Sequence, residues 1–439
     1  MANKKAVAVS ANIFLYGKRV GEIVHHPTRG FFFEYDKEFR VLGWEISPLK
    51  LPLKNGVIKI PTALERVSTF AGLPGVFADS LPDKFGNELL SKHFQERGFD
   101  PALVSPVQKL LYVGNTGMGA LEYRPMEKAR EHATLLPLAI RTLVEQAKKV
   151  IQGDLDESIS ELMLVGTSAG GARAKGLIGW DKKSGEIVAG IRELPKKYEH
   201  WIIKFDGADE KSKGWGKIEY TYSQMAKSAG ILMSDVHVLH ENGRNHFMTK
   251  RFDRTDGRKI HMHSLCGMVE TDYNEHRLFD YVSFAREVLR ITGRYQDLEQ
   301  VFRRAVFNLF ARNQDDHLKN FAFLMDEQGK WSLSPAYDLC FSLGGWCDDN
   351  QLTFDGRLGQ DVKYSDLIGI ADKLGVKKPA RIIDDVLEAL SKWQILAAKN
   401  KVSSGIIAKI QKAYQERRQS VGTSAPVTEK KPPKKRIKK

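Results

Sequence analysis

Residues 311–324 read ARNQDDHLKNFAFL, and this polar stretch decides how the rest of the chain is interpreted. Two aspartates, a histidine, a lysine and two asparagines fall within nine positions before apolar residues return. The preceding segment, DLEQVFRRAVFNLFARN, has apolar residues at helical spacing. A solvated turn and a catalytic loop can both follow such a helix, so the spacing within the stretch has to distinguish them.

The spacing of Asp315 and Asn320 favours a catalytic loop. Asn320 follows Asp315 by five positions, as in the D-x-x-x-x-N loop of protein kinases. In that loop the Asp accepts or orients the substrate hydroxyl, and the Asn offers a neutral oxygen to Mg²⁺. Only Asp315 lies five positions before Asn320, which predicts Asp315 as the base and Asp316 as a structural neighbour. This pattern alone is not specific.

A second carboxylate is needed, because Mg²⁺ takes hard oxygen ligands. The segment WSLSPAYDLCFS supplies Asp338 at the end of a short apolar run, eighteen residues after Asn320. A kinase places its metal-binding aspartate there, although the local sequence is Tyr-Asp-Leu rather than Asp-Phe-Gly. A turn or cap after the proline is the alternative interpretation of Asp338.

A glycine-rich segment, ELMLVGTSAGGARAKGLIGWD, lies between two apolar runs that we expect to be strands. Gly166 and Gly171 have the spacing of a Walker loop, but Ala172 and Arg173 stand where Lys and Ser or Thr are required. The segment therefore favours a glycine-rich hairpin over phosphates, as in kinases, with a flexible turn as the alternative.

Lys204 ends the apolar strand HWIIKFDG, the position of the kinase lysine that contacts the α- and β-phosphates. Its expected partner is Glu219 in the next helix, KIEYTYSQMAKSAG, which Gly230 closes. A lysine at a strand end is usually just solvated. The order of glycine loop, lysine, glutamate, catalytic loop and metal aspartate is what favours a kinase-like chain.

We therefore expect an α+β, two-lobed, protein-kinase-like fold. Its expected parts are a β-rich N-terminal subdomain (1–125), a linker helix with a mixed nucleotide-binding lobe (126–252), an all-helical lobe with the catalytic loop (253–420) and a disordered tail (421–439). The strands of the second part are expected to begin at SELMLVG, and the first residues are expected to form a β-hairpin around YGK rather than a signal peptide.

Composition limits the class of protein to which the chain can belong. The chain has 439 residues, 42% of them hydrophobic, which excludes wholesale disorder. Its three cysteines have no metal-ligand spacing, and no window holds 18 consecutive apolar residues, so we expect a cytoplasmic protein.

Charge leaves a second class of function open. The net charge is +14, and the segment EKKPPKKRIKK at residues 429–439 holds seven Lys or Arg and one Glu. This tail is either a solubilising appendage or a salt-dependent contact with nucleic acid. The alternatives to an active kinase are therefore a catalytically weak, DNA-associated nucleotide binder and a phosphotransferase for lipids or small molecules.

Four motifs in combination resemble the HipA-type toxin serine/threonine kinases of bacterial toxin–antitoxin systems. They are LPGVFADSLPD near the front, SAGGARAK as the phosphate loop, DHLKNF as the catalytic loop and SPAYDL as the metal-binding segment. The resemblance covers nearly the whole chain and implies an ATP- and Mg²⁺-dependent serine/threonine kinase.

The resemblance also implies roles for individual residues. Asp315 would be the catalytic base, with Asn320 and Asp338 as Mg²⁺ ligands and Lys204 paired with Glu219. Ser168, or its neighbour Thr167, would be autophosphorylated, which silences the kinase. The residues implied to contact the nucleotide are Gly170, Gly171, Ala172, Arg173, Ala174, Lys175, Lys204, Lys250, Arg251, Phe252, His317, Leu318, Lys319, Asn320, Tyr337 and Asp338, with the backbone of Lys250 to Phe252 against adenine.

Two segments depart from the family pattern. Arg173 and Ala174 replace a Gln-Glu pair before Lys175, and HMHSLCGMVETD replaces an acidic segment after the hinge TKRFDR. Members of the family act on aminoacyl-tRNA synthetases and bind a small helix-turn-helix antitoxin that also binds operator DNA. The resemblance implies such partners here, with a role in bacterial persistence, and the two departures leave the identity of the protein substrate open.

Overall fold

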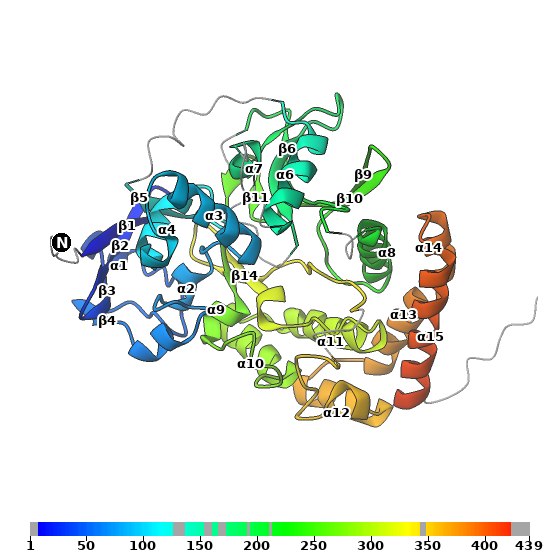
Figure 1. The fold of residues 1–439 in the computed structure, drawn as a ribbon. Helices are drawn as coiled ribbons and strands as arrows, with labels where there is room; N and C mark the ends of the chain where they lie inside the picture. Colours follow the sequence, from blue (N-terminus) through cyan, green and yellow to red (C-terminus); the bar gives the residue numbers. More distant parts are fainter. Residues whose placement is uncertain are drawn as a thin grey trace, which may run out of the picture.

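The computed structural model describes residues 8–125, 137–152, 160–165, 173–190, 194–209, 213–342 and 348–422. Figure 1 shows three parts: a β-rich N-terminal subdomain, a mixed lobe of strands and helices, and a helical lobe that contains α10 to α15. Among the described residues, no helix is long and apolar enough to cross a membrane.

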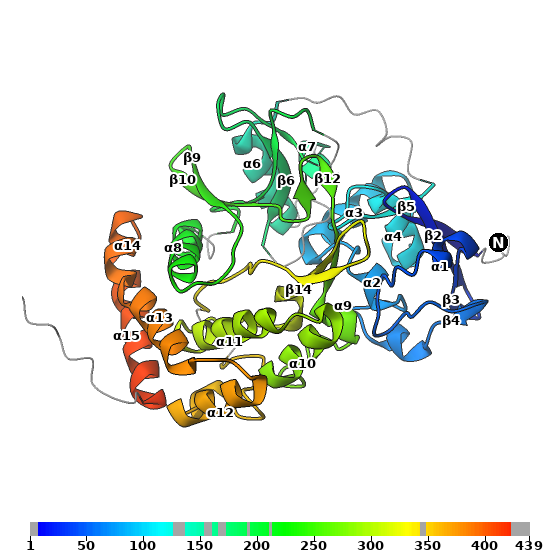
Figure 2. The ribbon, with the colours of Figure 1, turned by 180° about the vertical axis from the view of Figure 1, so that it is seen from behind.

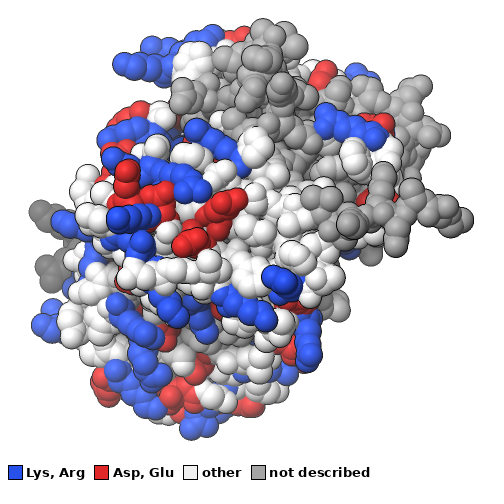
Figure 3. All heavy atoms as spheres, turned by 90° about the vertical axis from the view of Figure 1, so that its left-hand side faces the viewer, with Lys and Arg blue, Asp and Glu red and all other residues white. Residues whose placement is uncertain are grey.

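The N-terminal subdomain is built on an antiparallel five-stranded sheet in the order β4-β3-β2-β1-β5. The predicted hairpin is present, because Tyr16 and Gly17 both have positive φ and turn β1 into β2. Lys and Arg side chains are interspersed with Asp and Glu on the face of the molecule shown in Figure 3. The elements are β1 (Val9–Leu15), β2 (Lys18–His26), β3 (Gly30–Tyr35), α1 (Lys37–Val41), β4 (Val57–Lys59), η1 (Thr62–Arg66), α2 (Gly75–Ala78), α3 (Lys84–Glu96), η2 (Pro101–Leu103), α4 (Pro106–Val113) and β5 (Leu121–Arg124).

The mixed lobe has an antiparallel sheet in the order β7-β6-β8-β10-β9. Helix α3 of the N-terminal subdomain joins its core, since Phe85 and Leu89 pack in one cluster with Leu143 and Val144 of α6. The elements are α6 (Ile140–Gln152), α7 (Ser160–Val165), β6 (Lys175–Trp180), β7 (Ile187–Ala189), β8 (Glu199–Lys204), α8 (Trp215–Ser228), β9 (Val236–Glu241) and β10 (Arg244–Lys250).

One secondary-structure prediction in this lobe is wrong. The segment SELMLVG was expected to be a strand, but residues Ser160–Val165 form the helix α7. Leu162 and Val165, three positions apart, are both buried in the cluster that also holds residues of β6. A short apolar run can form either a strand or a buried helical turn, and periodicity over six residues cannot separate the two.

The lobe that was expected to be all-helical is mainly helical, but it also contains a three-stranded sheet in the order β13-β14-β15 and a small ribbon of β11 and β12. The predicted helix RIIDDVLEALSKWQILAAKN is divided at Lys392 into α13 and α14. The elements are β11 (Arg254–Thr255), β12 (Arg258–Lys259), β13 (His261–Ser264), α9 (Leu265–Val269), α10 (Tyr281–Thr292), α11 (Tyr295–Phe310), η4 (Leu318–Asn320), β14 (Ala322–Met325), β15 (Trp331–Leu333), η5 (Gly359–Asp361), α12 (Tyr364–Leu374), α13 (Pro379–Ser391), α14 (Trp393–Lys399) and α15 (Ser404–Val421).

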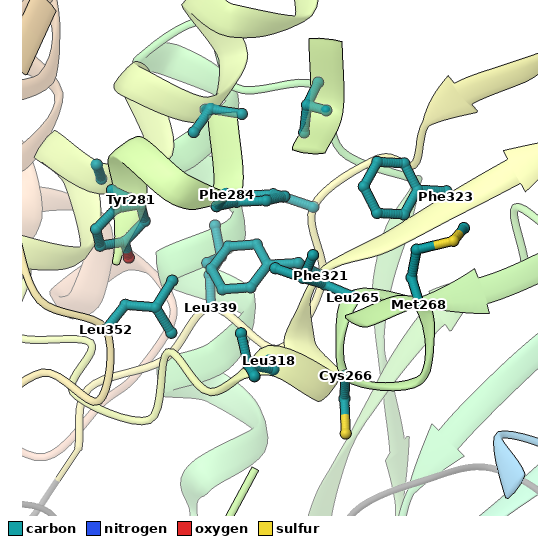
Figure 4. Packing of buried hydrophobic residues seen from close by; sticks show 14 of the residues in the cluster. Leu265, Cys266, Met268, Tyr281, Phe284, Leu318, Phe321, Phe323, Leu339 and Leu352 are labelled. Atoms are coloured by element: carbon teal, nitrogen blue, oxygen red, sulfur yellow. The ribbon is translucent and has the colours of Figure 1, made fainter. Parts of the chain in front are cut away.

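A large core of buried apolar side chains supports the region around residues 315–320. Figure 4 shows Leu318 and Phe321 packed with Leu265, Phe284 and Leu352. The aromatic rings of Phe284 and Phe321 lie 4.6 Å apart. Because Leu318 and Phe321 are close-packed in the core, they hold residues 315–320 in a fixed position.

Helix α8 is fastened to the helical lobe, as the view from behind in Figure 2 illustrates. Tyr222 of α8 donates a hydrogen bond to the backbone oxygen of Ala311 at 2.7 Å. Its ring lies 5.8 Å from that of Trp393 in α14, and Asn400 donates to Thr221 of α8 at 2.9 Å. The helix that carries Glu219 is thereby placed relative to the loop that follows α11.

The N-terminal subdomain contacts the two other parts through polar bonds and a close backbone approach. The backbone N–H of Gly119 donates to the buried carboxylate of Asp253 at 2.7 Å. Across the contact of α2 and α9, a Cβ on Gly75 would lie 2.0 Å from the backbone oxygen of Gly267. Only glycine permits this approach, so the N-terminal subdomain packs closely against α9.

Candidate active site

Asp315 and Asn320 lie together on the loop between α11 and β14. The Asp315 side chain is 45% exposed and accepts a hydrogen bond from Gln351 Nε2 at 3.0 Å. Its backbone N–H donates to Ser342 Oγ at 3.0 Å. Asn320 Nδ2 donates to the backbone oxygen of Asp315 at 2.7 Å. The two residues selected by their spacing are therefore directly bonded, and the Asp315 carboxylate is accessible.

Asp316 has the opposite environment. Its side chain is buried and accepts hydrogen bonds from Tyr281 Oη at 2.6 Å, Asn350 Nδ2 at 2.9 Å and the backbone N–H of Gln351 at 2.6 Å. Burial raises the pKa of Asp316 to about 6, although the three donors act in the other direction. A buried carboxylate with three fixed donors anchors the loop and cannot meet a substrate.

Lys204, Glu219 and Asp338 form one cluster. Lys204 is the last residue of β8, and its Nζ lies 2.6 Å from Glu219 Oε1 of α8. The same ammonium group is hydrogen-bonded to Asp338 Oδ1. Asp338 lies beyond the end of β15 in a left-handed conformation with φ of 55°. This conformation is uncommon outside glycine and marks a position that the surrounding structure enforces.

The electrostatics of the cluster follow from its burial and its pairing. Burial opposes the charged form of Asp338, but the nearby ammonium groups of Lys204 and Lys175 outweigh it and hold the pKa of Asp338 well below its usual range. Burial likewise opposes the charge of Lys204, and the carboxylates of Asp338 and Glu219 raise its pKa. Both members of the Lys204–Asp338 pair are therefore charged at neutral pH.

Two further cations from the end of the glycine-rich segment join this cluster. Arg173 lies 3.6 Å from Glu219 Oε2, with its guanidinium 4.9 Å from the ring centre of Trp215. Lys175, at the start of β6, lies 3.5 Å from Asp83 Oδ2 of the N-terminal subdomain. Ala174, between them, is buried. The expected contacts of Thr167, Ser168, Gly170, Gly171 and Ala172 lie outside the described residues.

Lys250 and Arg251 of the predicted hinge form hydrogen bonds and an ion pair with other residues of the protein. The backbone N–H of Lys250 donates to the oxygen of Asp235 at 2.8 Å, and that of Arg251 donates to the oxygen of His200 at 3.0 Å. The Arg251 guanidinium is paired with Asp253 at 2.7 Å. The amides of Lys250 and Arg251 are thus already used as donors.

Aromatic contacts connect the predicted hinge to the predicted catalytic loop and the predicted metal-binding segment. The ring of Phe252 lies 5.6 Å from that of Tyr337. The Tyr337 hydroxyl donates to the backbone oxygen of Lys319 at 2.6 Å. This bond ties the residue before Asp338 to the residue before Asn320, so the two predicted metal ligands come from segments that are fastened together.

The neighbours of Asn320 have different surroundings. Leu318 is buried in the core, and Lys319 Nζ lies 4.7 Å from the ring centre of Tyr273. His317 Nε2 is 3.9 Å from Asp315 Oδ1, and its ring lies 5.0 Å from that of Tyr273. His317 is therefore near the Asp315 carboxylate, Lys319 lies against Tyr273, and Leu318 serves packing.

The site fits a nucleotide-bound magnesium ion. No group of three or more His, Cys, Asp or Glu side chains in the described part of the chain is arranged to hold a metal by itself. Magnesium in nucleotide sites takes one or two protein oxygens and completes its shell with phosphates and water. Asp338 is ionised, and the amide nitrogen of Asn320 is bonded to Asp315, which leaves its oxygen as the atom for a cation.

Ser47, His263 and Asp79 form a hydrogen-bonded series that resembles a catalytic triad. Ser47 Oγ lies 3.0 Å from His263 Nε2, and His263 Nδ1 lies 2.6 Å from Asp79 Oδ2. The order Ser–His–Asp is that of a hydrolase triad. However, Ser47 is only 1% exposed, so no substrate can reach its hydroxyl. The series instead joins the N-terminal subdomain to β13.

Sequence reasoning missed three residues near the site: Ser342, Gln351 and Asp83. Ser342 and Gln351 hold Asp315 from beyond the catalytic loop, and no local pattern marks them. Asp83 ends the motif LPGVFADSLPD, which indicated the family without assigning a role to its aspartates. Its contact with Lys175 became apparent only in the folded chain.

The fold and the site together define a two-lobed, protein-kinase-like protein with an added N-terminal subdomain. The HipA-like C-terminal domain matches residues 167–394, more than half of the chain, and the HipA N-terminal domain matches residues 11–124. The chain therefore belongs to the HipA family, which confirms the resemblance to HipA-type toxins that its motifs indicated.

One solved structure supports the fold. HipA of Shewanella oneidensis MR-1, solved with HipB and its operator DNA, is similar with a TM-score of 0.67 and 15% identity, over 94% of this chain and 96% of that chain. This likeness confirms the predicted fold class. The proinflammatory kinase CtkA of Helicobacter pylori matches with a TM-score of 0.36 and 11% identity, over 51% of this chain and 88% of that chain.

A curated relative is Y4mE of Sinorhizobium fredii, whose name describes it as a kinase. It is 28% identical over 166 residues, which are 36% of this chain and 36% of that protein. The chain thus matches about a third of the length of this relative.

Proposed function

We propose that this protein is an ATP- and Mg²⁺-dependent serine/threonine protein kinase that acts as the toxin of a toxin–antitoxin pair. The observation that carries the proposal is the bonded cluster of Lys204, Glu219 and Asp338, tied through Tyr337 and Lys319 to the loop of Asp315 and Asn320. These are the groups that phosphoryl transfer from ATP requires.

The cations of the site suit a polyanionic substrate. Lys204, Lys175 and Arg173 converge on the carboxylates of Glu219 and Asp338. Positive groups fixed at one end of a site stabilise the charge of phosphate oxygens, because they need no reorganisation when that charge develops. In this proposal Lys204 binds the phosphates and Glu219 holds the Lys204 ammonium in position.

Asp315 is the proposed base. It accepts the proton of a serine or threonine hydroxyl as the oxygen of that hydroxyl bonds to the γ-phosphorus and the bond to the ADP oxygen breaks. Gln351 and Ser342 keep Asp315 oriented for this transfer. Asn320 and Asp338 would hold Mg²⁺, which when bound neutralises developing phosphate charge.

Transfer of label from γ-labelled ATP to the protein itself and to a generic basic acceptor tests the activity. Asp338→Ala and Lys204→Met should each lower the rate by roughly 10²–10³-fold, because each removes a charge that the transferring phosphate meets. Asp235→Asn is a matched control, since Asp235 is exposed and only loosely paired with Lys227. Rates for the two site variants equal to that of the control would contradict the proposal.

The proposed partners rest on family membership. They are a helix-turn-helix antitoxin that binds operator DNA and a protein substrate of the aminoacyl-tRNA synthetase class. Phosphoproteomics of cells that express the wild type or Asp315→Asn would identify the substrate. The same samples would report phosphate on Ser168 or Thr167 in the wild type alone. A synthetase that is equally phosphorylated in both samples would count against this substrate.

A further inference from the structure

Two lysines stand opposite each other at the centre of the site. Lys175 of β6 and Lys204 of β8 are direct partners in the antiparallel register. Lys175 is 3% exposed, and the Lys204 side chain is 14% exposed. Two buried ammonium groups on neighbouring strands repel each other and must each be compensated by a carboxylate.

The carboxylates that compensate them come from three different parts of the chain. Glu219 of α8 and Asp338 pair with Lys204. Asp83 of the N-terminal subdomain lies 3.5 Å from Lys175, and its own side chain is 7% exposed. Burial and the charge of Lys204 disfavour the charged form of Lys175, whereas Asp83 and Asp338 favour it.

Asp83 is fixed in its direction. It is the N-cap of α3, and its Oδ1 accepts a hydrogen bond from the backbone N–H of Gly86 at 2.6 Å. The cap leaves Oδ2 directed at Lys175. Helix α3 itself packs into the core of the mixed lobe through Phe85 and Leu89, so the carboxylate cannot drift away from the site.

We propose that Asp83 is a positioning residue for the nucleotide: it holds Lys175 as a second phosphate-binding lysine beside Lys204, which makes the N-terminal subdomain part of the ATP site. The inference rests on the proposed kinase function. Asp338 is already bonded to Lys204, whereas Asp83 faces Lys175 from a separate element. Loss of the Asp83 charge leaves Lys175 less fixed where the phosphates bind.

Asp83→Asn separates this role from helix capping, because the Asn side-chain oxygen still caps α3 while the charge is removed. In the full-length chain we expect its Kd for Mg-ATP to rise about tenfold, the effect of about 1.4 kcal/mol. The rate of label transfer at saturating ATP should fall by less than the affinity for Mg-ATP does, since Asp83 acts mainly on binding through Lys175.

A double-mutant cycle shows whether Asp83 acts through Lys175. Lys175→Met should weaken ATP binding at least as much as Asp83→Asn, and the double variant should bind no more weakly than Lys175→Met alone. Asp100→Asn is the matched control, because Asp100 is an exposed N-cap whose side chain accepts from Ala102 at 2.9 Å. Thermal unfolding of each variant verifies folding, and Asp83→Ser, which also caps without charge, replaces Asp83→Asn if the latter unfolds.

An unchanged Kd in Asp83→Asn, or additive losses in the double variant, would overturn the inference and leave the kinase proposal intact. A wild type that binds no Mg-ATP would instead overturn the proposed function, and the inference with it. A tenfold rise that disappears in the Lys175→Met background supports the inference.

Discussion

Two short segments of this protein each carry a pair of aspartates, and in each pair the two side chains have different roles. In the catalytic loop, Asp316 is buried against Tyr281 and Asn350, while Asp315 is accessible. In residues 79–83 of the N-terminal subdomain, Asp79 is bonded to His263 and to Ser264 of β13. Asp83 is directed at Lys175. In both segments one carboxylate anchors the backbone and the other faces the charged site.

The two segments differ in where their partners lie. The hydrogen-bond partners named above for Asp315 and Asp316 lie in the helical half of the chain, whereas Asp79 and Asp83 bond to different lobes. The catalytic loop is therefore a unit within one lobe, and residues 79–83 are a brace between lobes. Substitutions in the catalytic loop should therefore affect phosphoryl transfer or local stability. Substitutions in residues 79–83 should affect the packing of the N-terminal subdomain against the two lobes.

The largest stability effect is expected for the anchor of the catalytic loop. Asp316→Ala leaves the hydroxyl of Tyr281, the amide of Asn350 and the N–H of Gln351 without their acceptor, which should cost about 3–4 kcal/mol. Denaturant unfolding measures this loss. Asp235→Ala, at an exposed position, should change stability by less than about 0.5 kcal/mol. Equal losses for both variants would remove the distinction between anchor and surface.

A smaller effect is expected at Gly75 of α2, just before the brace, where the chain meets α9 of the helical lobe. A methyl group on Gly75 would lie 2.0 Å from the backbone oxygen of Gly267, so Gly75→Ala must push α2 away from α9. We expect a loss of about 2–3 kcal/mol in the free energy of unfolding. Gly369→Ala in α12, where a methyl group meets nothing within 4 Å, should be neutral or slightly stabilising. A Gly75→Ala variant as stable as Gly369→Ala would show that the contact is loose.

The two anchors should respond to pH with opposite sign. The pKa of Asp316 is raised from 3.8 to about 6 by burial, so the folded chain binds the extra proton and this group lowers stability as pH rises from about 4 to about 6. Burial also opposes the charge of Asp79, but its bonds to His263 and Ser264 lower its pKa below 3.8. Its stabilisation is present above about pH 4 and is lost as pH falls through the folded pKa.

Unfolding free energies of Asp316→Asn and Asp79→Asn, measured across pH, give these two slopes. Asp316→Asn should remove the decline between pH 4 and 6, and Asp79→Asn should remove part of the loss below pH 4. Slopes that change in the same direction in both variants would contradict the assignment.

Much of this site could be predicted because its signals are local in sequence. Asp315 and Asn320 are fixed by a spacing of five, and Lys204 and Glu219 by their places on a strand and the next helix. Asp83, Gln351 and Ser342 could not be found in this way, since their roles depend on partners far along the chain. The segment SELMLVG was assigned to the wrong element for a related reason: Leu162 and Val165 of this helix are buried by tertiary packing, which overrides a short apolar pattern.

The central claim, that Asp315 is the base of a phosphoryl transfer, is tested most directly by single-turnover transfer from γ-labelled ATP in the wild type and Asp315→Asn. Asn keeps the shape of the side chain and its contact with Gln351, so ATP affinity and thermal stability should remain within about twofold and about 1 °C of the wild type. We expect a transfer rate at least roughly 10³-fold lower in Asp315→Asn. A rate equal to that of the wild type would contradict it.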